Sequence, residues 1–161
     1  MSKYVPTFNN VIFDQLVTNK GSLNYCVRWD SMDKLSKSDV SRFEVMLKRQ
    51  FKAWNQWLID YDCWPYNEID VKICLTACYK YQDQAKSSDT SACEGTPFDT
   101  LLWPTQHMDG GAGGDWGQRV NAENMLATLS QDQTVIVAHE IGHGFGIPDF
   151  YCIRMTGYEK V

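Results

Sequence analysis

The stretch that decides the fold is His139-Glu140-Ile141-Gly142-His143-Gly144-Phe145-Gly146-Ile147-Pro148-Asp149, which contains the pattern H-E-x-x-H. Two histidines at this spacing project from one face of a helix, one turn apart, so both imidazoles can reach one metal ion. Glu140 lies between them, where its carboxylate can contact a water molecule on that metal without being a ligand itself. We therefore expect a helix here, with an apolar first turn over 135–138 and Asp132 as its N-cap, that carries a zinc site.

A zinc ion bound by two histidines needs at least one further protein ligand and one open position. Asp149 is the candidate, because Gly146 can adopt the left-handed conformation that ends a helix and Pro148 cannot continue one. Glu159, close to the last residue, is the alternative third ligand. The motif could also occur by chance on an ordinary amphipathic helix with solvated or structural histidines, but the spacing of Gly146 and Asp149 favours a metal site.

The full pattern H-E-x-x-H-x-x-G-x-x-D resembles that of zincin metallopeptidases whose third ligand is Asp, such as snapalysin. The stretches 24–29 (N-Y-C-V-R-W), 110–120 and 148–151 are also similar to secreted microbial neutral zinc metallopeptidases, and the resemblance runs from about Phe8 to Tyr151. It implies one catalytic domain over 1–161 with an α+β, zincin-like fold of the metzincin type. Such a fold combines a small twisted mixed sheet, one long backing helix and an active-site helix.

The resemblance also implies a methionine-containing turn beneath the metal, for which Met155 is the candidate, although Met155 could equally be a surface residue of the tail. The C-terminal part of this chain is short compared with that family. This shortness predicts a cleft that lacks its C-terminal wall, or a protein that is inactive or depends on a partner.

The implied function is that of a zinc-dependent endopeptidase with one catalytic Zn²⁺ bound by His139, His143 and Asp149. Zinc lowers the pKa of its bound water from ~15.7 toward ~7, and Glu140 would take the proton as general base and return it to the leaving amine. We expect a protein or peptide substrate that lies extended, paired with an edge strand. Candidates for contacts to the substrate or transition state are Tyr151, His107 and Tyr158.

Two other functions compete with this one. The chain could be a non-catalytic secreted binding module or effector of zincin fold that retains the zinc site, but an inactive site commonly loses the general base and Glu140 is present. A purely structural zinc domain fits poorly, because such sites are closed by four protein ligands and only three are apparent.

The composition favours a single globular domain, which we expect to be monomeric: the chain has 161 residues, of which 43% are apolar and 13% aromatic. The net charge of −5 does not favour nucleic acid or an anionic membrane as partner. No stretch approaches the ~20 apolar residues of a membrane span.

The cysteine content favours disulfides in a secreted protein. Sequence cannot choose among the possible pairings of three bridges, and a zinc site built from cysteines is disfavoured because no C-x-x-C pair is present. If 71–78 is a strand, Cys74 and Cys78 are about 13 Å apart and need different partners. The first six residues lack the apolar region of a signal peptide, so secretion requires a processed or engineered start. The six cysteines are Cys26, Cys63, Cys74, Cys78, Cys93 and Cys152.

Periodicity and turn residues predict the remaining elements. The clearest is a long helix over 36–61 with Ser38 as N-cap, whose apolar stripe packs on a sheet. Residues 1–20 are expected to hold a short strand or a docked arm. The glycine-rich segment 106–117 is expected to be a mobile loop at the rim of the cleft, rather than a phosphate cradle. The other expected elements are strands over 23–29, 69–79 and 98–103, the last stopped by Pro104, and a short helix over 121–129.

Overall fold

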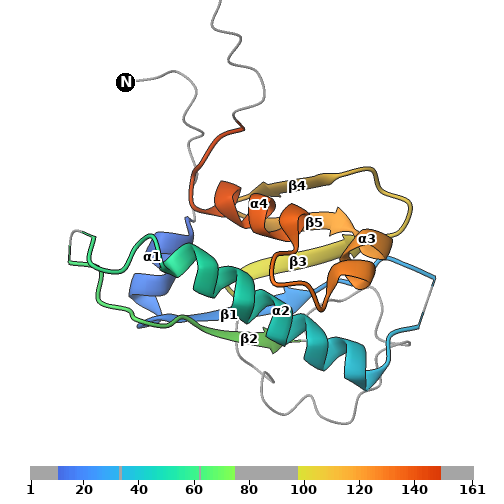
Figure 1. The fold of residues 1–161 in the computed structure, drawn as a ribbon, viewed down its shortest axis with the longest axis horizontal. Helices are drawn as coiled ribbons and strands as arrows, with labels where there is room; N and C mark the ends of the chain where they lie inside the picture. The colour runs from blue at the N-terminus through green and yellow to red at the C-terminus, as the bar shows by residue number, and fades with distance from the viewer. Residues whose placement is uncertain (1–10, 33, 62, 75–97, 150–161) are drawn as a thin grey trace, which may run out of the picture.

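A computed structural model describes residues 11–32, 34–61, 63–74 and 98–149 (Figure 1). Within these ranges the chain forms four helices and five strands, which confirms the α+β class. In chain order they are α1 (Ile12–Thr18), β1 (Ser22–Val27), α2 (Lys37–Asn55), β2 (Asp70–Cys74), β3 (Thr100–Thr105), β4 (Gly111–Gly114), β5 (Gly117–Asn121), α3 (Ala122–Thr128) and α4 (Val135–Gly144).

The five strands form one mixed sheet in the order β2-β1-β3-β5-β4. Strands β2, β1, β3 and β5 run parallel, whereas β4 pairs with β5 in the antiparallel direction and lies at the edge. In Figure 1, α2 crosses the β1–β2 half of the sheet and α4 lies along β4 and β5. The small mixed sheet, the long helix and the motif-bearing helix predicted from sequence are therefore all present.

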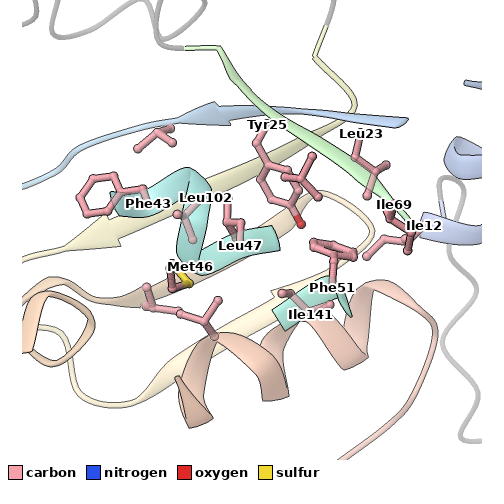
Figure 2. Packing of buried hydrophobic residues seen from close by; sticks show 14 of the residues in the cluster. Ile12, Leu23, Tyr25, Phe43, Met46, Leu47, Phe51, Ile69, Leu102 and Ile141 are labelled. Carbon is pink, nitrogen blue, oxygen red and sulfur yellow. The ribbon is translucent and has the colours of Figure 1, made fainter. Parts of the chain in front are cut away.

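The hydrophobic core lies between this sheet and the two helices (Figure 2). Tyr25 of β1 and Leu102 of β3 project toward Phe51 of α2 and Ile141 of α4, and all four side chains are almost completely buried. Burial of apolar side chains of this size is the main stabilising contribution to the fold, at about 1.5–3 kcal/mol for each. The same packing positions α4, and with it the H-E-x-x-H motif, over one half of the sheet.

Helix α2 confirms the predicted long helix, although it is shorter than expected and its N-cap lies two residues before the predicted one. Ser36 Oγ accepts a hydrogen bond from the Asp39 N–H at 3.2 Å, and the Asp39 carboxylate accepts one from the Ser36 N–H at 3.0 Å. The prediction of Ser38 as N-cap is thus wrong, because only a cap at Ser36 places Asp39 where this reciprocal capping box can form. Phe43, Leu47 and Phe51 are buried, as a helix packed on a sheet requires.

Two further predictions about secondary structure are wrong. Ile12 and Leu16 are buried on one side of a helix, α1, rather than belonging to a strand or an arm. Pro104 lies inside β3 instead of stopping it. Its carbonyl accepts a hydrogen bond from the Asp30 N–H at 2.9 Å, so Pro104 contributes an acceptor to the sheet although it has no N–H to donate.

The glycine-rich segment also differs from its prediction. It forms the β4–β5 hairpin at the edge of the sheet and is not a rim loop. The predicted strand over 69–79 is confirmed as β2 up to Cys74, and its remainder lies outside the described residues. None of the described helices combines the length and apolarity needed to cross a bilayer.

The cysteines are only partly covered by the described side chains. Cys26, buried in β1, is disulfide-bonded, whereas Cys63 is exposed and carries a free thiol. The expectation that all six cysteines pair in three bridges is therefore not met at Cys63. Cys78, Cys93 and Cys152 lie outside the described residues.

Candidate metal centre

The start of α4 is positioned by a residue of the long helix. Thr134 occupies the N-cap position without a side-chain cap, so the prediction of Asp132 as N-cap is wrong. Instead the buried amide of Gln50 accepts a hydrogen bond from the Thr134 N–H at 3.2 Å and donates one to the Asp132 carbonyl at 3.4 Å. Local sequence cannot reveal this anchor, because Gln50 and Thr134 are 84 positions apart.

The end of α4 follows the prediction. Gly146 has φ +85°, its N–H donates to the His143 carbonyl at 2.8 Å, and the Ile147 N–H donates to the Gly142 carbonyl at 3.1 Å. This pair of bonds is a Schellman motif, which ends a helix and reverses the chain direction. The reversal carries Pro148 and Asp149 back past the face that bears the two histidines.

The turn brings the Asp149 carboxylate to both imidazoles. Its Oδ1 atom lies 3.0 Å from Nε2 of His139 and 3.4 Å from Nε2 of His143. Ligand atoms around a tetrahedral zinc ion with bonds of about 2.0–2.1 Å are roughly 3.3 Å apart. Both distances from Asp149 Oδ1 are close to this spacing, and two imidazole nitrogens with one carboxylate oxygen are a donor set that zinc accepts.

The second nitrogen of His143 supports this orientation. Nδ1 lies 2.6 Å from the Ile147 carbonyl oxygen, which can only accept, so Nδ1 carries the hydrogen and donates. That tautomer leaves the Nε2 lone pair free for a metal. Histidine ligands in metalloproteins are commonly oriented by such a second bond.

Glu140 is buried beside these groups, with 5% of its surface exposed. Its Oε2 atom lies 3.7 Å from His143 Nε2 and has no hydrogen-bond partner. Burial raises the pKa of the Glu140 carboxyl group above its ordinary value; the imidazoles of His139 and His143 oppose this, and the Asp149 carboxylate adds to it. A buried carboxylate oxygen without a partner is costly, and a metal ion or a water molecule at this point would offset that cost.

Glu140 also offers an alternative ligand set. The donor atoms of His139, Glu140 and His143 all lie within 4.8 Å of one another, which is compatible with a shared metal ion. Two triads thus share the same pair of imidazoles, one completed by Asp149 and the other by Glu140. The 3.0 and 3.4 Å spacings to Asp149 match the edges of a zinc tetrahedron better than the 3.7 Å spacing to Glu140.

Strand β4 consists mainly of glycine because α4 lies directly on it. A Cβ atom at Gly113 would lie 2.3 Å from the backbone oxygen of Glu140, and one at Gly111 would lie 2.5 Å from its Oε1. Glycine is the one residue that permits this approach of strand and helix. The run of glycines that sequence reasoning assigned to a loop therefore marks a contact between backbones.

A cavity of about 720 Å³ opens over these groups. One wall is the glycine strand, the other is the first turns of α4, and the turn after α4 closes one end. Its volume lies within the ordinary range for a ligand site. The residues that line it are Gly110, Gly111, Ala112, Gly113, Val135, Ile136, His139, Glu140, His143, Pro148 and Asp149.

The remaining predicted site residues are not brought to this cavity. The His107 side chain is 83% exposed, its Nδ1 lies 3.1 Å from Oε1 of Glu123, and it does not line the cavity. The predicted contacts Tyr151 and Tyr158 lie outside the described residues, as do the proposed Met-turn residue Met155 and the alternative ligand Glu159.

One supporting residue was missed by sequence reasoning. Trp54 of α2 donates from Nε1 to the Ala138 carbonyl at 2.9 Å, and its ring occupies the space beside Gly142. Its position in the apolar stripe of α2 marked Trp54 as a packing residue, but nothing in the sequence indicated that it contacts α4.

Comparison of the chain with protein-family models, with curated proteins and with solved structures finds no match. The resemblance to zincin peptidases therefore stays a prediction from the sequence motif.

Proposed function

We propose that this chain is a zinc-dependent endopeptidase in which His139, His143 and Asp149 bind one zinc ion and Glu140 is the general base. The observation that carries the proposal is the position of Asp149 Oδ1, within 3.0 and 3.4 Å of the two histidine Nε2 atoms. A chance H-E-x-x-H on a surface helix would not require the chain to reverse and direct a carboxylate at both rings.

A catalytic rather than a structural role for the zinc is favoured because the protein supplies three ligands and leaves one coordination position open. Three protein donors with a cavity beside them are typical of catalytic zinc, whereas structural zinc is enclosed by four. When bound, zinc supplies Lewis-acid activation of a water molecule and of the substrate carbonyl.

Glu140 has the properties that a general base needs here. Its free Oε2 atom is directed toward the histidine pair, so it can take a proton from the attacking water and return that proton to the leaving amine. The raised pKa of its carboxyl group, caused by burial, makes Glu140 a stronger base toward the attacking water.

The edge strand β4 suggests how a peptide substrate lies. Within the described sheet, β4 is paired on one side only, with β5, and Gly111 and Gly113 both line the cavity. An extended peptide can therefore pair with this strand next to Glu140, without side chains in the way. A secreted location, suggested by the cysteine content, is part of the same proposal.

The test measures metal content and cleavage of an unfolded protein substrate for the wild type, Glu140→Gln and the control Glu44→Gln. The control replaces the same residue type at an exposed position of α2, where Glu44 pairs with Lys48. We expect one zinc per chain in all three and a loss of activity of at least ~10²-fold in Glu140→Gln alone. Equal activity in all three would reject Glu140 as the base, and zinc without cleavage in the wild type would favour a binding module.

A further inference from the structure

A row of three side chains crosses the sheet on the face opposite α4. Arg28 directly follows β1, Trp103 lies in β3, and Arg119 lies in β5 paired in register with Trp103. Successive residues of a strand point to opposite faces. Leu102 and Val120, the neighbours of Trp103 and Arg119, are buried in the core beneath α2 and α4, so this row faces the other way.

The two guanidinium groups sandwich the indole ring. The Cζ atom of Arg28 lies 4.0 Å from the centre of the Trp103 ring, and that of Arg119 lies 4.2 Å from it. Since β1 and β5 flank β3 on its two sides, the cations approach the indole from opposite directions. Each contact is a cation–π interaction, which stabilises the stack and fixes the orientation of the planar groups.

Hydrogen bonds hold the row in place. Arg119 donates from Nε to Thr105 Oγ1 at 2.9 Å, and Trp103 donates from Nε1 to Asp30 Oδ2 at 3.2 Å. These bonds leave the terminal nitrogens of Arg119 available. The side chains are therefore pre-arranged, so a ligand would not have to order them.

The row has two guanidinium groups and one neighbouring carboxylate, that of Asp30, which accepts from Trp103. In the part of the chain that the structure describes, neither Arg28 nor Arg119 forms an ion pair, although the protein has a net charge of −5. Arg28 Nε is also buried without a hydrogen-bond partner. Two half-buried like charges on one ring repel each other, and a buried donor without an acceptor adds a further cost.

We propose that Arg28, Trp103 and Arg119 form a binding site for a tetrahedral oxyanion, a phosphate or sulfate group. Such an anion offers several acceptor oxygens to the arginine donors and neutralises the paired positive charge. The site lies on the face of the sheet opposite the metal centre and is independent of the proposed peptidase activity.

The test titrates the full chain with sodium phosphate and with sodium sulfate at constant ionic strength maintained with sodium chloride. Binding is measured by calorimetry for the wild type, Arg28→Gln, Arg119→Gln and Arg42→Gln. Arg42 is the matched control, since it pairs with Asp39 on exposed α2. We expect saturable binding of both anions, weakened roughly tenfold or more by loss of either Arg28 or Arg119 and unchanged in Arg42→Gln.

A second readout requires no variant. The Nε–Hε resonance of Arg28 in the wild type should shift on addition of phosphate or sulfate but not of chloride. No saturable binding of either anion, binding unaffected by both arginine substitutions, or an unmoved Arg28 resonance would each overturn the proposal.

Discussion

The backbone oxygen of Glu140 occupies the place where a side chain at Gly113 would begin, because a Cβ atom there would lie 2.3 Å away. This contact joins the glycine strand to the motif-bearing helix. It fixes the distance between the two walls of the cavity and places Glu140 directly over the strand on which we expect the substrate to bind.

Replacing Gly113 with alanine should separate β4 from α4. Backbone atoms cannot move aside as a flexible side chain can, so we expect a loss of about 1–3 kcal/mol or more in the free energy of unfolding, with weaker zinc binding. Denaturant unfolding measures the first effect. The neighbouring exposed change Ala112→Ser should stay within ~0.5 kcal/mol of wild type, and an equally stable Gly113→Ala would show that the strand is not this close to the helix.

Removal of the Asp149 carboxylate should distinguish the two possible ligand triads. If Asp149 is the third ligand, Asp149→Ala should weaken zinc binding by more than the roughly 10- to 100-fold that loss of a residue hydrogen-bonded to a metal ligand costs. Competition with a chelator measures the affinity. Glu140→Gln and the exposed control Asp132→Ala should keep zinc, whereas retention in Asp149→Ala with loss in Glu140→Gln would point to the triad of His139, Glu140 and His143.

The left-handed turn at Gly146 should matter for both stability and metal binding. Its φ of +85° disfavours residues with a Cβ atom, so Gly146→Ala should cost about 1–2 kcal/mol and misplace Asp149. Gly146→Asn should lose less stability and less zinc affinity than Gly146→Ala, since asparagine tolerates this conformation. Thermal unfolding with and without zinc measures the stability of the wild type and the two variants. Equal stability of all three would contradict the role assigned to the turn.

The indole N–H of Trp54 should stabilise α4 through the Ala138 carbonyl. Trp54→Phe keeps most of the ring against Gly142 and removes the hydrogen bond, so we expect a loss of about 0.5–1.5 kcal/mol in the free energy of unfolding. Trp57→Phe is the matched control, because Trp57 is 81% exposed and should change stability by less than ~0.5 kcal/mol. Similar losses in the two variants would attribute the effect to ring size alone.

The capping box of α2 should give a pH-dependent stability difference. Hydrogen bonds from the Ser36 side chain and backbone lower the pKa of Asp39. A carboxyl group whose pKa is lower in the folded state stabilises the fold above its unfolded pKa, and this contribution is lost as the pH falls through the folded value.

Ser36→Ala should therefore cost about 0.5–2 kcal/mol at neutral pH, with the difference from wild type narrowing below about pH 4. Urea unfolding of both proteins at several pH values measures this difference in the free energy of unfolding. Ser38→Ala, at the cap position expected from sequence, should show neither the loss nor the pH dependence.

Local sequence was sufficient for the parts of this protein that depend on helix geometry. The spacing of His139 and His143 places both rings on one face, and the apolar repeat of Phe43, Leu47 and Phe51 marks the buried side of α2. Gly146 marks the helix end in the same way. These features follow from the helical repeat and from the conformational freedom of glycine, which act over a few residues.

The other features of the site depend on tertiary packing and could be seen only in the structure. The glycines of β4 have the composition of a loop, and they form a strand because α4 leaves no room for side chains above them. The anchor of Thr134 on Gln50 and the bond from Trp54 to Ala138 each join residues 84 positions apart. His107 was a candidate for contacts to the substrate or transition state, yet it pairs with Glu123. Such contacts depend on how segments distant in the sequence pack against each other, and the spacing of neighbouring residues does not determine that packing.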